Sequence, residues 1–297
     1  DYKKTDWASI KEMTFSSKKD HTYYGGQKKD KKTGLLYSYD SDGFFCGDSL
    51  KDTEQTAKSC VKEIDFEWGD TASDKDVYQL EDGKISVPKA VSYTEDLFNK
   101  NVSKLEKGKF QYKVQHLYVM KNTETGCYDY NMAIGRVYKG IFIDTSSDFS
   151  ISEGRSYNKV YCGIHMLAVM RHKDSLDYVN SCRELLDIEN ENEKEKIISP
   201  VWALQSINKK IAHIDGFRFQ DCGLVYLLVQ DNKLAKDNQQ DVYQQVNETT
   251  YLRPVWLFMS KGSGTVSDTM TRDHHGTSVV VDAIDGTLYY YESTGTY

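Results

Sequence analysis

The last third of the chain shows one helical pattern followed by four strand patterns. Apolar residues recur at steps of three and four residues after Pro200, and this spacing predicts an amphipathic helix with Ser199 as its N-cap and an end near Gly216. Its apolar stripe consists of Val201, Leu204, Ile207 and Ile211. The segments that follow are rich in Val, Tyr, Phe, Leu and Trp. They predict strands at 217–230, 250–260, 277–282 and 287–292.

An earlier part of the chain repeats this order of elements. The segment Ile85-Ser86-Val87-Pro88 predicts a second helix start, and Lys107-Gly108 predicts its end. One side of this helix is lined by Val91, Thr94, Leu97, Phe98 and Asn101. Strand patterns follow at 110–121, 127–138, 162–170 and 176–179. We interpret the two halves as a duplicated unit, with coincidence as the alternative, because many α+β proteins place strands after a helix.

The closest local match between the two halves lies in their final hairpins. Lys173-Asp174-Ser175-Leu176-Asp177-Tyr178 corresponds in kind to Ile284-Asp285-Gly286-Thr287-Leu288-Tyr289. The turn around Ile284-Asp285-Gly286 is therefore expected to have its counterpart at 173–175.

The pattern as a whole predicts an α+β fold made of tandem units. Each unit is one helix packed on a four-stranded antiparallel sheet, and a smaller N-terminal α+β region precedes them. The expected boundaries are 1–84 for the N-terminal region, 85–196 for the first unit and 197–297 for the second. The N-terminal region is expected to hold a hairpin at 35–45, an amphipathic stretch at 53–62, and strands at 64–68 and 77–80.

The C-terminal unit carries a recognisable combination of strands. Tyr251-Leu252-Arg253-Pro254-Val255-Trp256-Leu257-Phe258 is followed, after a polar loop, by Val279-Val280-Val281-Asp282-Ala283-Ile284-Asp285-Gly286-Thr287-Leu288. This combination resembles the closing strands of PepSY-like domains and of YycI-like extracytoplasmic proteins, and also uncharacterised secreted proteins or lipoproteins of Gram-positive bacteria. The resemblance implies an exported domain and, in the YycI-like case, a regulator of a membrane sensor kinase. The tandem order also resembles the architecture of β-lactamase inhibitor proteins, an analogy of fold alone.

Composition and charge narrow the partners. The chain has 297 residues, 39% of them hydrophobic, and 22 Tyr against 11 Phe, which favours sheets with one solvated face. The formal net charge of -7 makes nucleic acid a poor partner. The basic run at 28–32 is interrupted by Asp30, and we predict a solvated hairpin loop there.

The location of the protein is predicted to be extracytoplasmic, either secreted or as a cell-surface lipoprotein. No segment approaches the roughly 20 apolar residues that cross a bilayer. The sequence begins at Asp1 without an apolar signal region, which leaves open a lipobox signal peptide or a membrane helix ahead of it.

The six cysteines carry no metal-site spacing. They are widely separated, at Cys46, Cys60, Cys127, Cys162, Cys182 and Cys222. Neither a CxxC pair nor a CxxC…HxxxH arrangement occurs, so spacing gives no support for zinc. Free buried thiols and one or more disulfides stay equally open.

Two acidic turns could be mistaken for calcium sites. Asp282 and Asp285 flank a turn closed by Gly286, and we predict that Asp282 accepts hydrogen bonds from turn amides rather than binding calcium, which needs six to eight oxygen ligands. The segment 40–43 is likewise interpreted as a Gly-containing turn. Pro254 within a strand predicts an edge or a bulge.

The histidines and the remaining motifs do not predict catalysis. His274-His275 is interpreted as a polar loop tip, and Cys162 with His165 as part of a buried strand rather than a nucleophile and its base. His116 is expected to be a sheet histidine and His172 to lie near a turn. The segment 261–265 lacks the spacing of a phosphate-binding loop. We expect no catalytic, cofactor-binding or metal-binding residues.

These observations favour a non-catalytic exported binding or regulatory domain. Its partner is expected to be a protein or peptide at the cell envelope, with a peptidase or a sensor kinase as the target. The alternative is an extracellular hydrolase of cell-wall or dietary polymers, whose acids would come from separate loops. A structural spacer without a concave site is a third possibility.

Overall fold

The chain divides into two compact units in the computed structural model. Unit 1 comprises residues 1–139 and 164–189, and unit 2 comprises residues 140–163 and 190–297. Both consist mainly of antiparallel strands with a single described helix each, so the α+β class is confirmed. The structure describes residues 21–24, 27–30, 35–40, 43–48, 58–65, 75–143, 160–161, 166–181, 186, 188, 191, 195–211, 219, 221–230, 250–259 and 278–292.

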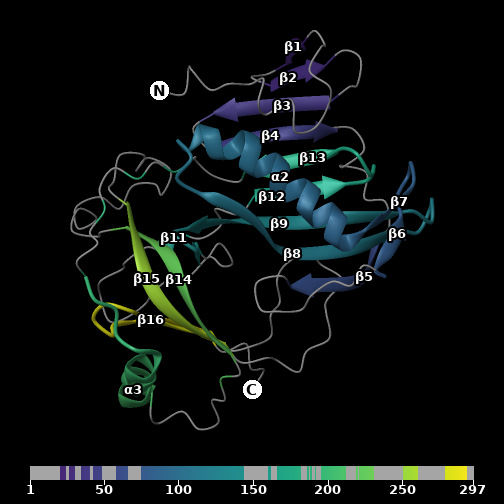
Figure 1. Cartoon of the computed structure of the whole chain (residues 1–297). Helices are drawn as coiled ribbons and strands as arrows, with labels where there is room; N and C mark the ends of the chain where they lie inside the picture. Colours follow the sequence, from purple (N-terminus) through teal and green to yellow (C-terminus); the bar gives the residue numbers. More distant parts are fainter. Residues whose placement is uncertain are drawn as a thin grey trace. The chain divides into compact units, whose positions relative to one another are not determined.

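A long antiparallel sheet forms the body of unit 1, and its order is β1-β2-β3-β4-β13-β12-β9-β8-β5 (Figure 1). The strands are β1 (His21–Tyr24), β2 (Gln27–Asp30), β3 (Leu35–Asp40), β4 (Gly43–Asp48), β5 (Lys58–Asp65), β8 (Gln111–Asn122), β9 (Tyr128–Tyr138), β12 (Met166–Met170) and β13 (Tyr178–Ser181). A separate hairpin is formed by β6 (Val77–Gln79) and β7 (Lys84–Ser86).

One helix, α2 (Val87–Leu105), runs across a face of this sheet (Figure 1). Pro88 stands in its first turn, and the positive φ angles of Lys107 and Gly108 end it, as the sequence predicts. Its inner side is buried at Val91, Thr94, Phe98, Asn101 and Val102. The Phe98 ring lies 5.9 Å from the ring of Tyr112 on β8.

The sheet face below α2 is a continuous layer of buried side chains. On β8 the alternation would break at Gln115, but this residue forms a bulge in the pairing with β9. A Cβ at Gly135 would stand 2.3 Å from the Gln115 side chain, so Gly135 makes room for the bulge. Apolar side chains before and after the bulge therefore face α2.

A buried ion pair ties the end of α2 to this sheet. Glu106, directly after the helix, accepts hydrogen bonds from Arg136 Nε at 2.9 and 3.1 Å and from the Leu186 amide at 2.8 Å, while the Tyr112 hydroxyl donates to the other side of the carboxylate. Burial alone would lower the pKa of Arg136, but the adjacent Glu106 carboxylate outweighs it and raises that pKa. The Glu106 carboxylate is therefore held by several donors as well as by the charge of Arg136.

Unit 2 contains a smaller antiparallel sheet in the order β11-β14-β15-β16-β17, together with one helix (Figure 1). The elements are β10 (Ile141–Phe142), β11 (Val160–Tyr161), α3 (Pro200–Ile211), β14 (Asp221–Gln230), β15 (Thr250–Met259), β16 (Ser278–Asp282) and β17 (Leu288–Glu292). The four strands predicted after α3 are thus confirmed in order. The expected helix end near Gly216 lies outside the described residues.

The predicted tandem units of one helix and four strands are not what the sheets show. The run β8-β9-β12-β13 continues into β4 on one side and β5 on the other, because strands of the predicted region 1–84 pair directly with those of 85–196. The helix positions also differ, since α2 packs on β8, the first strand of its run, and α3 packs on β16, the third. Unit 2 contains residues 197–297 together with 140–163 and 190–196, which the prediction placed in the first unit.

The element that the two units do share is a helix on a hairpin with one particular turn. Asn122 Oδ1 accepts the amides of Glu124 and Thr125 at 2.9 and 3.2 Å, and Asp282 Oδ1 accepts those of Ile284 and Asp285 at 2.7 and 3.2 Å. In both turns the first amide bonds the carbonyl five residues on, and a glycine follows with φ +73 or +76. The predicted turn role of Asp282 is confirmed.

The counterpart of the C-terminal turn is therefore 122–127, and the match proposed for 173–175 is wrong. In the turn between β12 and β13 the acceptor is Asp177, at the far end, and its Oδ2 accepts the amides of Arg171 and His172 at 2.7 and 3.2 Å. Residues 173–178 and 284–289 are similar in type, but the acceptor Asp follows the amides that it binds in the first turn and precedes them in the second. The match in sequence fails because Gly and Asp suit many turns.

Three smaller expectations need correction. Pro254 lies within β15, which pairs with β14 and β16, so it is not on an edge strand. Its carbonyl accepts the Ala283 amide, just after the end of β16. Because the ladder with β16 has ended at this position, the missing N–H of Pro254 costs no ladder hydrogen bond. The basic run is not simply a loop, because residues 28–30 belong to β2. The predicted amphipathic stretch at 53–62 overlaps strand β5.

Candidate functional site

The beginning of α3 in unit 2, together with the residues just ahead of it, carries exposed apolar side chains. The exposed fractions are 62% for Val201, 63% for Trp202, 48% for Ile197 and 37% for Leu204. The helix is anchored instead by Ala203 and Ile207, which are buried. Their cluster also contains Phe258, Val279, Val281 and Leu288.

This arrangement differs from the predicted stripe. Ile207 is buried as expected, but Val201 and Leu204 face outward, and the side chain of Ile211 is outside the described residues. The reason lies in the wide apolar arc of the helix: Ala203 and Ile207 form a second stripe at the same spacing, and the small Ala203 allows close approach to β16. Sequence periodicity alone does not choose between the two stripes.

The start of α3 is held firmly, so its orientation is well defined. Ser199 Oγ accepts the Trp202 amide at 3.3 Å, which confirms the predicted N-cap. The Ile198 amide donates to the Ala283 carbonyl at 2.6 Å, and the Ile198 carbonyl accepts from Trp256 Nε1 at 2.9 Å. These two bonds connect the residue before the N-cap to β15 and to the turn after β16.

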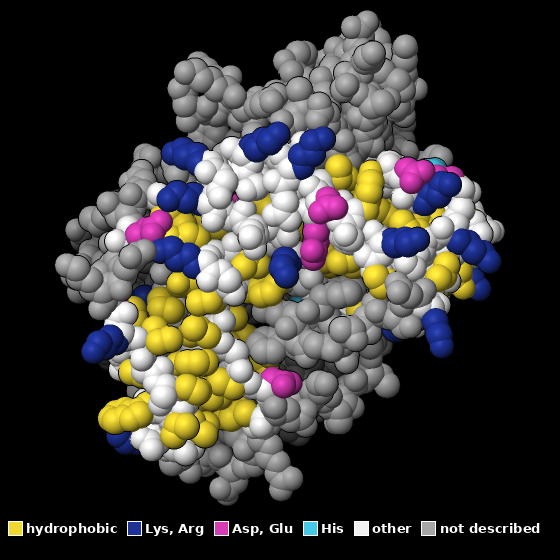
Figure 2. All heavy atoms as spheres, viewed as in Figure 1, with side chains coloured by type: hydrophobic (Ala, Val, Ile, Leu, Met, Phe, Trp, Pro, Cys, Tyr) yellow, Lys and Arg dark blue, Asp and Glu magenta, His cyan; other side chains and the backbone are white. Residues whose placement is uncertain are grey.

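A hydrophobic field extends from α3 over the neighbouring strands β14 and β15 (Figure 2). On the sheet side it includes partly exposed Leu224, Leu252, Pro254 and Trp256. We call this set, with the four exposed residues above, the α3 surface. Lys196 and Lys209 are exposed before and near the end of the helix. Contiguous apolar patches with a charged margin are typical of protein interaction sites.

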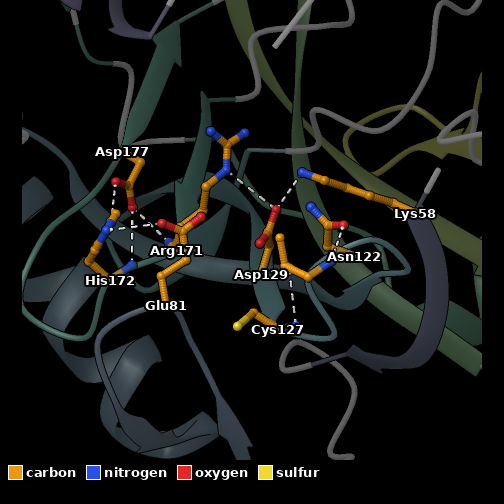
Figure 3. Close-up of polar contacts among 9 residues, drawn as sticks. Lys58, Glu81, Asn122, Cys127, Asp129, Arg171, His172 and Asp177 are labelled. Atoms are coloured by element: carbon orange, nitrogen blue, oxygen red, sulfur yellow. Dashed lines mark hydrogen bonds and ion pairs between the residues drawn. The ribbon is translucent and has the colours of Figure 1, made fainter. Parts of the chain in front are cut away.

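A second candidate is a charged cluster at one end of the unit 1 sheet (Figure 3). His172 Nδ1 lies 2.7 Å from Asp177 Oδ1, and His172 Nε2 lies 3.3 Å from Glu81 Oε2. Partial burial would lower the pKa of His172, but the hydrogen bond and charge of Asp177 and the charge of Glu81 outweigh it, so the pKa is raised. An Asp-oriented imidazole is a general base only when its second nitrogen faces a reactant. Here Glu81 stands at that nitrogen.

The same cluster continues along the strand ends through Asp129. Arg171 Nε lies 3.4 Å from Asp129 Oδ2, and Lys58 on β5 also contacts this carboxylate (Figure 3). Asp129 is almost completely buried, so two cations compensate its charge. The arrangement is that of a structural ion network joining β5, β9 and the turn after β12.

The acidic turn of unit 2 is satisfied by protein groups. Arg253 Nε lies 2.6 Å from Asp282 Oδ2, and Arg253 Nη2 lies 3.2 Å from Asp285 Oδ2. Asp285 Oδ1 accepts the Thr287 amide at 2.8 Å. The oxygens that a calcium ion would need are thus engaged with Arg253 and with turn amides. Among the described residues no three His, Cys, Asp or Glu side chains are grouped to hold a metal ion.

The other predicted candidates fall into two groups. His116 is buried on β8, as expected for a sheet histidine, and Asp40 pairs with Gly43 as the closing pair of the β3–β4 hairpin. Others lie outside the described residues: Cys162, His165, 261–265 and His274-His275. Within the described part, Cys60, Cys127 and Cys222 are free thiols. No described helix is long and apolar enough to cross a membrane.

Sequence reasoning missed both sites because their residues carry no motif. Trp202 was within a predicted helix, but its direction depends on which stripe packs on the sheet. Glu81 and His172 belong to different turns and meet only in the fold. The run Val201-Trp202-Ala203 is a usable signal, because three adjacent apolar residues on a helix cannot all face the same side.

Comparison with known proteins shows a fold that is shared with another protein but gives no information on activity. No family model matches the chain, and no curated protein matches it. Among solved structures, the chain is similar to the crystal structure of an uncharacterised protein from Eubacterium rectale, with 16% identity and a TM-score of 0.52. The match covers 95% of this chain and 77% of that one, and at this identity it shows a shared fold alone. The PepSY-like or YycI-like resemblance stays a prediction.

Proposed function

We propose that this chain is a non-catalytic binding or regulatory module that uses the α3 surface to bind a protein or peptide. The single observation that supports this function is the exposed apolar face of α3, with Trp202 at 63% exposure on a helix whose start is fixed by hydrogen bonds. Trp is the residue type most often found at the energetic centre of an interface. Trp202 is one of a group of exposed apolar side chains, and such a group is typical of an interaction site.

The chemistry of the α3 surface suggests the chemistry of its partner. The centre is apolar, and the described charges next to it are of both signs, with Glu195, Lys196 and Lys209 all exposed. A partner segment with apolar side chains at its centre and charged side chains at its margin complements it. The proposed partner is a protein at the cell envelope, with a peptidase or a sensor kinase as the target, and the proposed location is extracytoplasmic, secreted or lipid-anchored. The location and the class of target rest on the resemblance of 251–258 and 279–288 alone.

The test compares two matched surface variants. Purified wild-type chain is immobilised and exposed to the envelope fraction of the producing cells, and a retained protein is then purified and its Kd measured by calorimetry. Trp202→Ser with Val201→Ser is expected to weaken that Kd about 30-fold or more, as removal of a central hot spot of ~2 kcal/mol does. Val61→Ser in unit 1 is the control, because Val61 is also an exposed valine, at 49%.

Three results would overturn the proposal. One is an unchanged Kd in the Trp202 variant, and another is an equal loss in the Val61 control. The third is turnover of a cell-wall glycan, a dietary polymer or a peptide by the purified chain, which would favour a hydrolase.

A further inference from the structure

We propose that His172 is a proton-controlled latch that fastens the β6–β7 turn to the β12–β13 turn in unit 1. This device is separate from the α3 surface and does not depend on it. The two turns come from distant parts of the sequence and meet at the end of the sheet (Figure 3).

The two turns are also in contact through bonds that do not involve the His172 ring. The Glu81 amide donates to the Arg171 carbonyl at 3.0 Å, and the Lys173 amide donates to Asp82 Oδ1 at 2.8 Å. The Lys173 side chain also lies over Gly83, where an added Cβ would stand 3.3 Å from its Cδ. These contacts bring the hairpin and the turn together independently of the charge on His172.

The contact between His172 and Glu81 is different because it requires a charged imidazole. A neutral histidine carries one N–H, and Asp177 takes it at Nδ1, 2.7 Å away. The lone pair of Nε2 then faces the Glu81 carboxylate, 3.3 Å away, which is repulsive. A protonated histidine donates from both nitrogens and joins the two carboxylates.

The surroundings of His172 are mainly acidic. The groups around it are Glu81 and Asp82 of the β6–β7 turn, Arg171, Lys173, Asp174 and Asp177 of its own turn, Tyr93 of α2, and Asp129 of β9. Arg171 is directed to Asp129, and the Tyr93 hydroxyl donates to the Asp174 carbonyl at 2.7 Å. The charges that act most strongly on the ring are those of Asp177, Glu81 and Asp82, and all three are carboxylates.

The sign of the pH effect follows from the raised pKa of His172. Because the folded protein binds this proton more tightly than the unfolded chain, the latch stabilises the fold fully below the unfolded histidine pKa of about 6.5. That stabilisation is lost as the pH rises through the folded pKa. The latch is closed in mildly acidic surroundings and open in alkaline ones.

The experiment measures the proton and the contact separately in the full chain. NMR of the imidazole nitrogens gives the pKa of His172, and hydrogen exchange reports the Glu81 and Lys173 amides, which both cross between the turns. After correction for intrinsic exchange, their protection is expected to fall roughly twofold to fivefold between pH ~5.5 and ~8.5, the range for one half-exposed ion pair. His172→Gln is expected to remove this pH dependence.

A matched pair of carboxylate variants distinguishes the effect of the Glu81 charge on His172 from a general change in structure. Glu81→Gln should lower the pKa of His172, whereas Asp174→Asn, which removes a nearby charge that does not touch the ring, should leave it nearly unchanged. The latch is overturned if the pKa of His172 is 6.5 or lower. It is equally overturned if protection does not depend on pH, or if the two variants shift the pKa alike.

Discussion

The two helices begin in nearly the same way and end up in different environments. Both have a Pro in the first turn, one or two residues after a Ser, and both pack on a hairpin whose turn is built by Asn122 or Asp282. The inner side of α2 is buried along its length, while α3 is anchored by Ala203 and Ile207 and presents Trp202 to solvent. An equivalent start and support thus leave one helix as core and the other as a surface.

The largest expected effect on stability comes from removing the buried side chain that anchors each helix. Phe98→Ala should destabilise unit 1 by about 3–5 kcal/mol, because a fully buried ring is removed, and Ile207→Ala should destabilise the α3 region by about 2–5 kcal/mol. Native-state hydrogen exchange measures the stability of each unit separately, whereas a single melting temperature cannot distinguish the two units. If Ile207→Ala left the α3 amides as protected as before, the anchoring assigned to Ile207 would be wrong.

The end of α2 provides the next comparison, since α3 lacks a described counterpart of its buried ion pair. Glu106→Gln leaves Arg136 charged in a dry site, and we expect a loss of about 3–5 kcal/mol in unit 1. The double variant with Arg136→Met should regain part of this loss, because it also removes the buried guanidinium charge. Denaturant titration followed by exchange at the α2 amides measures both. A double variant weaker than Glu106→Gln would contradict this account.

A smaller effect compares the two hairpin turns. Gly126→Ala and Gly286→Ala impose the same strain of about 1 kcal/mol, because the φ angles are +73 and +76. At Gly286 the new Cβ would also stand 2.9 Å from Ser206 Oγ on α3, whereas nothing lies within 4 Å at Gly126. Gly286→Ala should therefore cost more, and adding Ser206→Ala should bring it close to Gly126→Ala. Equal costs for the two single variants in hydrogen exchange would show that α3 does not press on its turn.

The smallest expected effect on stability is that of replacing Trp202, although we expect this replacement to have the largest effect on binding. Trp202→Ser should change the free energy of unfolding by less than about 0.5 kcal/mol, because the side chain is exposed. The same exchange measurement checks this. A loss comparable with that of Ile207→Ala would mean that Trp202 is part of the core and not available to a partner.

Local signals were enough to predict the elements. Pro88 with Gly108, and Ser199 with Pro200, located helix ends because these residues act within one turn of the chain. The turn role of Asp282 was predictable for the same reason: its acceptor oxygen reaches amides two and three residues ahead.

Long-range arrangement was not predictable from the same signals. The pairing of β4 with β13 depends on which sheet edge is open when the strands meet, and neither Cys46 nor Val179, which face each other across it, carries that information. The buried side of α3 depends on whether β16 accepts the small Ala203 or the larger Val201. The meeting of Glu81 with His172 needs both turns in place.

The pairing of β4 with β13 has a consequence for the order of folding. The meander β1–β4 leaves the ribosome early, but Gly47 finds its partner Tyr178 only after the whole of α2, β8, β9 and β12 has been made. At synthesis rates of 5–20 residues per second the edge of β4 stays open for on the order of ten seconds. Closing so long a loop is also slow, so this edge is where a chaperone would be most useful during synthesis.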